Sequence, residues 1–140
     1  HGDTTGHSIR EHLTYHYTSS LDFAYMMIEY ARFFDLDITG YLPVIEGIVK
    51  YYDNYYRKEN LMRTGQELDA SGRLVIYPSC ALEFAQGCRN NTDVIAGLDG
   101  VTDGLLNLPP GILGKDKIEY IKGFRKTLPP IPIAEKESSS

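Results

Sequence analysis

The chain has 140 residues, of which 42% are hydrophobic and 24% are charged, so it is long enough for one globular domain with a core. Lys and Arg number 14 and Asp and Glu number 19, which gives a net charge of -5. Without a basic stripe we expect no nucleic-acid partner, because phosphate binding needs a cationic surface. No apolar run approaches the ~18 residues of a spanning helix, so we expect no membrane partner.

Residues 1–18 form a polar, His-rich N-terminal segment in which Gly2 and Gly6 disfavour a helix. His12 and His16 have the i, i+4 spacing of two zinc ligands on one helical face. No glutamate directly follows His12, as it does in the metalloprotease signature, and no third ligand is evident, so we predict no metal site. We expect a solvated terminus, and the alternative places His16 in the lining of a cleft.

The first predicted helix begins at Ser19 or Ser20, because either residue is a suitable N-cap. Apolar residues then recur with helical spacing as far as Phe34. Phe23 and Tyr30 widen the apolar band. The sequence therefore predicts a helix that is buried on two sides.

The second predicted helix covers about residues 41–59, with Pro43 tolerated in its first turn. A short connector separates it from the first helix, so the two should form an antiparallel αα-hairpin. Many of the 11 tyrosines fall in these helices. Such rings suit half-buried seams between helices, and they also suit a cleft that stacks on sugars.

The second half of the chain predicts a short strand-like insert near 73–77, stopped by Pro78. Residues 79–91 show no clear period. A third helix is expected from about Asn91, a good cap, and a fourth from about 115 to 127. The fold class is thus mainly α, with two αα-hairpins over residues 19–133 and a disordered-type tail at 134–140.

Glu83 is the candidate catalytic residue. It follows the strand-like run, and its neighbours Leu82 and Phe84 are apolar. Apolar neighbours remove water from a carboxyl group, and desolvation raises a carboxyl pKa. A raised pKa suits a general acid that protonates a glycosidic oxygen near neutral pH. The alternative is a structural glutamate that pairs with Arg89 or caps a helix.

The run Tyr77-Pro-Ser-Cys-Ala-Leu-Glu83, followed by residues 90–98, resembles the six-hairpin, (α/α)6-toroid glycosidases. The likeness is greatest to a poorly characterised group of secreted glycosidases, and it is more distant to the inverting α-L-fucosidases. The fucosidases carry a Pro-Ser-x-x-x-Glu segment, whose Glu is the general acid, and an Asp at a following helix start. The positions that match are Pro78, Ser79, Glu83 and Asp93. The resemblance covers roughly residues 15–133.

The chain departs from the fucosidases around the acid. It has Leu82-Glu83-Phe84 where they have Pro-Glu-Asn. Their Asn pair that holds the water, and the Asp that completes the base, have no match here. Their substrate choice is therefore not carried over.

The resemblance implies part of a toroid in a glycoside hydrolase-like protein, with Glu83 as acid and with Tyr77, Phe84, His16 and Asp93 at the substrate. Twelve helices need on the order of 300 residues. The second carboxylate, ~6.5–9.5 Å away in an inverting enzyme, would therefore come from the remainder of the parent barrel. We expect carbohydrate as ligand, no cofactor, a secreted location and an inactive isolated chain. The alternatives are a non-catalytic carbohydrate-binding or structural helical protein, and an interaction module.

Two further features lie close to the candidate acid. Cys80 and Cys88 flank Glu83, and they form either a small disulfide loop that stiffens this segment or two buried thiols. Asn90 begins an N-glycosylation sequon, which has meaning in a secreted protein.

Three aspartates belong to the third predicted helix. Asp93 lies ten positions after Glu83 and is a conceivable second carboxylate, but we expect it to start or cap the helix. Asp99 and Asp103 are four residues apart, so they should share one face of the helix. We expect these two to form a solvated edge.

Overall fold

The computed structural model describes residues 17–81 and 85–132. In this part of the chain, α1 spans Thr18–Phe34, α2 Leu42–Thr64, β1 Ser79–Ala81, β2 Ala85–Cys88, α3 Thr92–Leu106 and α4 Lys115–Thr127. The fold is mainly helical, which confirms the predicted class. None of these helices combines the length and apolar character that crossing a bilayer requires.

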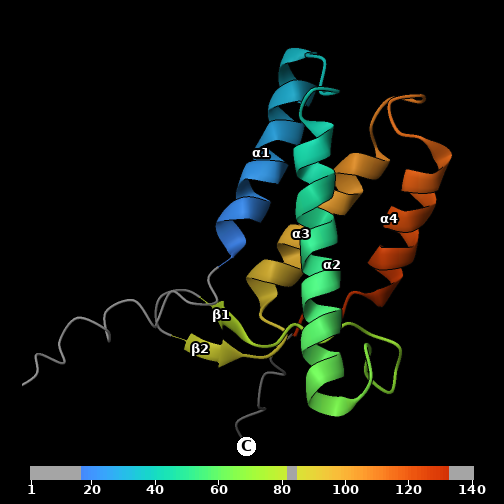
Figure 1. Ribbon diagram of the computed structural model, residues 1–140. Coiled ribbons are helices and arrows are strands. Elements are labelled where there is room, and N and C mark those ends of the chain that lie inside the picture. The colour runs from blue at the N-terminus through green and yellow to red at the C-terminus, as the bar shows by residue number, and fades with distance from the viewer. Residues whose placement is uncertain (1–16, 82–84, 133–140) are drawn as a thin grey trace, which may run out of the picture.

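The helices form two antiparallel pairs, α1 with α2 and α3 with α4 (Figure 1). Between the pairs, α1 and α3 lie side by side and run in the same direction, because Gly97 faces Leu21 and Gly104 faces Ile28. A Cβ added to Gly97 would lie 3.0 Å from Leu21 Cδ1. Glycine therefore lets these two helices approach closely.

Polar contacts join α2 to α4. The hydroxyl of Tyr120 donates to Asp53 Oδ2 at 2.9 Å, and Lys117 Nζ lies 2.7 Å from Glu46 Oε1. Asp53 is buried, and it also accepts from Arg57 Nε at 2.6 Å. The four helices thus form two layers, α1 with α3 and α2 with α4.

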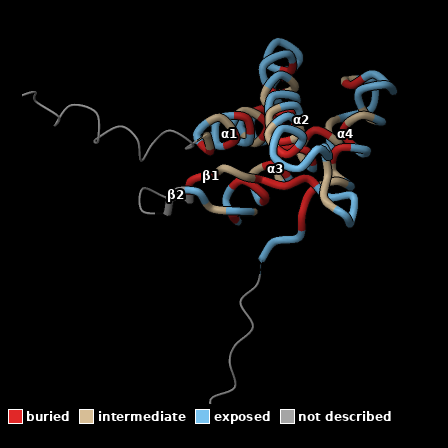
Figure 2. The backbone as a smooth tube through the Cα atoms, turned by 60° about the horizontal axis from the view of Figure 1, so that its bottom comes forward, coloured by how far each residue is buried: buried red, intermediate tan, exposed pale blue. Residues whose placement is uncertain are grey.

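The core lies where the two layers meet. Figure 2 shows that the buried residues follow the facing sides of the helices and the segment that leads into the hairpin. The core includes Leu21, Ala24, Ile28, Ile45, Val49, Tyr52, Tyr56, Leu74, Ile76, Leu98, Val101, Leu105, Ile121 and Phe124.

Residues 74–76 of the predicted strand-like insert are buried, but the insert forms no strand, and the first strand begins two residues after it, at Ser79. The backbone hydrogen bonds of the insert join it to the end of α4 and to Asn90, whose N–H donates to Ile76 O at 2.8 Å. Leu74 N donates to Thr127 O at 2.7 Å, and Ile76 N donates to the side-chain Oδ1 of Asn90 at 3.0 Å. The sheet is formed instead by β1 and β2, which lie within residues 79–91, where the apolar residues show no clear period.

Two predicted helix ends differ from the structure. Helix α1 begins at Thr18, and its N-cap is Tyr17 without a side-chain cap bond, so the expected serine cap is wrong. The Ser20 hydroxyl instead donates back to Tyr17 O at 2.8 Å. Helix α2 continues beyond residue 59 to Thr64, and it ends at Gly65 with φ 77°, a left-handed conformation that glycine adopts at little cost.

The outer side of α1 is uncovered among the described residues. Phe23 is 61% exposed and Tyr30 is 60% exposed, so the predicted burial of α1 on two sides is wrong. The exposed apolar residues recur with helical spacing and continue into the turn after α1. We call this surface the α1 apolar face, and it comprises Phe23, Met26, Tyr30, Phe33, Phe34, Leu36 and Tyr41.

Candidate functional site

Three of the predicted site residues, Glu83, Phe84 and His16, lie outside the described residues. The strands on either side of residues 82–84 are described, and they pair antiparallel. Ser79 lies opposite Cys88 in their register. The pairing brings together the two chain segments that flank the candidate acid.

Tyr77 precedes this hairpin and is half-buried. The guanidinium of Arg63 lies over its ring, 4.4 Å from the centroid. Arg63 also donates to Asn60 Oδ1 at 3.1 Å, which fixes the guanidinium in place. One face of the Tyr77 ring is therefore occupied, and only the other is left for a sugar.

Asn91 ties the hairpin to the start of α3. The Ser79 hydroxyl donates to Asn91 Oδ1 at 2.7 Å, and Asn91 Nδ2 donates to Cys80 O at 3.3 Å and to Asp93 Oδ1. The Asn91 side chain makes no cap bond to the helix, so the predicted cap is wrong in this respect. Asp93 is exposed in the first turn of α3, the position expected for it, where a carboxylate favours the helix dipole.

The cysteines and the sequon lie at the same hairpin. Cys80 is buried and Cys88 is half-buried in the structure. Burial raises the pKa of the Cys80 thiol. Asn90 is half-buried with φ 54°, and its Oδ1 accepts a bond from Ile76 N, so this side chain holds the extended run.

A cluster of tyrosines joins the start of α1 to the middle of α2. Tyr51 stacks on Tyr55 with centroids 5.6 Å apart, and Tyr17 packs edge-on against both rings. Tyr52 and Tyr56 are fully buried, and burial raises the pKa of Tyr52 to about 12. The cluster thus forms a helix seam, as expected, while Tyr51 remains partly exposed beside a groove of about 510 Å³.

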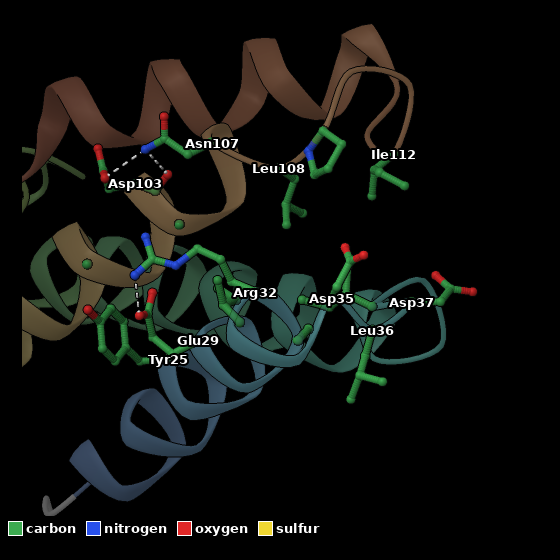
Figure 3. Close-up of a pocket in the computed structure, with 16 residues that line it drawn as sticks. Tyr25, Glu29, Arg32, Asp35, Leu36, Asp37, Asp103, Asn107, Leu108 and Ile112 are labelled. Carbon is green, nitrogen blue, oxygen red and sulfur yellow. Dashed lines mark hydrogen bonds and ion pairs between the residues drawn. The ribbon is translucent and has the colours of Figure 1, made fainter.

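A cleft of about 380 Å³ lies between the C-terminal halves of α1 and α3 (Figure 3). Gly100 and Gly104 line it, so α3 contributes no side chain at these two positions. Its apolar wall consists of Ile28, Ala31, Leu36, Ile38, Leu108, Pro109 and Ile112. Its polar lining consists of Glu29, Arg32, Asp35, Asp37, Asp103 and Asn107, together with the Tyr25 ring.

Sequence reasoning missed this cleft, although two of its polar contacts are local in the sequence. Arg32 Nη2 donates to Glu29 Oε2 at 2.6 Å, and Asn107 Nδ2 donates to Asp103 Oδ2 at 2.9 Å. Figure 3 shows the Arg32 and Glu29 side chains next to one another in the cleft. Helical spacing predicts each of these pairs, but it cannot predict that α1 and α3 meet.

The edge formed by Asp99 and Asp103 is solvated, as predicted, and α4 contributes a cation to it. Arg125 lies 2.9 Å from Asp99 Oδ1 and 2.8 Å from Asp103 Oδ1. All three side chains are partly exposed. We therefore assign the two aspartates to the α3–α4 junction and not to a catalytic pair.

Comparison with known proteins adds no assignment: no protein-family model, no curated protein and no solved structure matches this chain. Within residues 17–81 and 85–132, no group of three His, Cys, Asp or Glu residues is placed to hold a metal ion. The described part of the chain offers an apolar cleft with acidic lining, a groove beside a partly exposed tyrosine, and a hydrogen-bonded hairpin at the start of α3.

Proposed function

We propose that this chain is part of a helical, glycoside hydrolase-like barrel that acts on carbohydrate, with Glu83 as the general acid. The observation that carries the proposal is the uncovered α1 apolar face. Its seven large residues are each at least 50% exposed and recur along the outer side of one helix and the turn that follows it. Such a surface indicates that a further element covers α1 in the working protein.

The area of this face supports that interpretation. A whole aromatic side chain contributes roughly 150–250 Å². With the observed exposed fractions, the seven residues present on the order of 800 Å². A standard interface buries about 800 Å² on each partner, whereas the largest apolar patch on a typical monomer is about 300–600 Å².

The direction of the helices supports a repeating arrangement. Helices α1 and α3 are parallel neighbours in one layer, and α2 and α4 form the other layer. Solenoids and toroids stack αα-hairpins in this way, with equivalent helices side by side. A further hairpin next to α1 would continue both layers and cover the α1 apolar face.

The hairpin at the start of α3 is the part of the described structure that lies on either side of the candidate acid in the sequence. Ser79 and Asn91 tie β1 to α3, and the pairing of β1 with β2 holds both segments that flank Glu83. A general acid acts best when its carboxyl group is held within reach of the leaving oxygen. The second carboxylate would come from the remainder of the barrel, and a secreted location remains part of this proposal.

The test is glycoside hydrolysis by the longest natural protein that contains this chain. We expect Glu83→Gln to lower turnover on a panel of aryl glycosides by at least about 100-fold, the scale of general acid catalysis. Glu119→Gln is the matched control, because Glu119 is exposed on α4 and away from the hairpin. Near-normal turnover in Glu83→Gln, with both variants folded, would exclude Glu83 from the mechanism.

Tyr51 favours a second candidate function, non-catalytic carbohydrate binding. Tyr51 is 45% exposed and borders a groove that Ser19 and Ser20 also line. An aromatic face with nearby hydroxyls suits a sugar ring. This function predicts that Tyr51→Ala weakens oligosaccharide binding in calorimetry while Glu83→Gln leaves binding unchanged and no hydrolysis is seen.

A further inference from the structure

We propose that the cleft between α1 and α3 binds a small organic cation with an apolar body, such as a hydrophobic primary amine. The cleft holds about 380 Å³, which falls in the range of small-molecule sites. Its wall between the two helices is apolar, with Ile28 and Ala31 from α1 and Leu108 and Ile112 from the segment after α3. The inference does not depend on the glycosidase proposal.

The charges that line the cleft favour a cation. Four carboxylates and one guanidinium line it. Glu29 is bound to Arg32, and Asp103 to Arg125 of α4. No ion pair in the described part of the chain includes Asp35 or Asp37. Hydrogen bonds from the Thr39 N–H and hydroxyl, both 2.9 Å, lower the pKa of Asp37 and keep it ionised.

The helix ends add to this negative potential. Helix α1 ends at Phe34 and α3 ends at Leu106, and both C-termini lie at the cleft because the two helices are parallel. The last carbonyl groups of a helix carry a partial negative charge that stabilises a nearby cation, by up to about fivefold in binding for each helix. The same two ends disfavour an anionic ligand. An apolar wall and a negative rim together select an amine with a hydrophobic body.

Three probes of one shape test the charge preference: benzylammonium, benzyl alcohol and benzoate. Binding to the full chain is measured by amide chemical shifts in NMR titrations, with Leu36, Gly104 and Asn107 as reporters at the cleft. We expect benzylammonium to bind about tenfold more tightly than benzyl alcohol. The reason is that two helix C-termini and the carboxylates of Asp35 and Asp37, which are in no ion pair in the described part of the chain, attract the ammonium group. Benzoate should leave these amides unshifted.

Substitutions at the cleft test whether its carboxylates cause the preference for the ammonium group. Asp35→Asn with Asp37→Asn should weaken benzylammonium binding about tenfold and leave benzyl alcohol unchanged, because asparagine fits both the left-handed conformation at Asp35 and the turn at Asp37. Asp116→Asn removes a carboxylate that is exposed in the first turn of α4, outside the cleft, and should change neither affinity.

Three results would overturn the proposal. The first is equal affinity for the ammonium and the alcohol, which would leave only an apolar cleft. The second is a benzylammonium response that avoids the three reporter amides or persists in the double variant. The third is a cleft response to neutral methyl glycosides but not to the amine, which would assign the cleft to carbohydrate instead. None of these results depends on Glu83, so the glycosidase proposal is tested separately.

Discussion

Replacement of Gly104 by alanine tests the close contact between α1 and α3. A Cβ at this position would lie 2.9 Å from Ile28 Cγ2 and 3.2 Å from Ile28 Cδ1. Ile28 is 2% exposed, and a β-branched side chain in a helix has one strongly preferred rotamer, so it cannot turn aside. Overpacking costs about 1–3 kcal/mol, while alanine gains about 1 kcal/mol over glycine within a helix. We expect Gly104→Ala to lower the free energy of unfolding by about 1 kcal/mol.

Urea denaturation of Gly104→Ala and of a control, Gly123→Ala, measures this effect. A Cβ at Gly123 of α4 would meet nothing within 4 Å, so the control should gain up to about 1 kcal/mol. Adding Ile28→Ala to Gly104→Ala removes both crowded atoms, and the two changes should therefore couple favourably in a double-mutant cycle. If Gly104→Ala is as stabilising as the control, the close parallel packing of α1 and α3 is wrong.

Two further predictions concern stability. Tyr52 keeps its proton up to a pKa of about 12, whereas an unfolded tyrosine ionises near 10. The contribution of Tyr52 to the free energy of unfolding is therefore fully present below pH 10 and is lost as the pH rises through 12. In urea denaturation measured over this pH range, Tyr52→Phe should show a smaller loss of stability than the unsubstituted chain. Arg125→Ala breaks both ion pairs to Asp99 and Asp103. Because these side chains are partly exposed, we expect the free energy of unfolding to fall by less than about 1 kcal/mol, and by less still at high salt. Urea denaturation at two ionic strengths measures this effect.

The best-predicted parts of the fold are those where local signals agree. The fourth helix was expected at about 115–127 and spans Lys115–Thr127. Turn-forming residues precede it, and the pair Pro129-Pro130 follows it, so both ends are encoded nearby. The second helix was expected to end near 59, because residues 60–72 together are rich in polar and turn-forming residues, although Leu61 and Met62 lie among them. It continues to Thr64, because the residue that ends it is Gly65, which adopts the left-handed conformation of a helix C-cap.

The parts that were missed depend on contacts between distant segments. The run at 74–76 is apolar and buried, but its partners are Thr127 and Asn90, which no local pattern identifies. The cleft forms only because α1 meets α3. One signal for that contact was present in the sequence. Gly97, Gly100 and Gly104 share one helical face, and small residues at such spacing let two helices approach closely.

The most direct test of the central claim is the mass of this chain in solution, measured by sedimentation equilibrium over a range of concentrations. If the α1 apolar face is a seam that another helical element covers, the isolated chain should self-associate as the concentration rises. Phe23→Ser with Phe33→Ser, both on exposed positions of this face, should restore the monomer without loss of helical content. A chain that stays monomeric at high concentration and melts cooperatively would contradict the account, because its helices would then need no further partner.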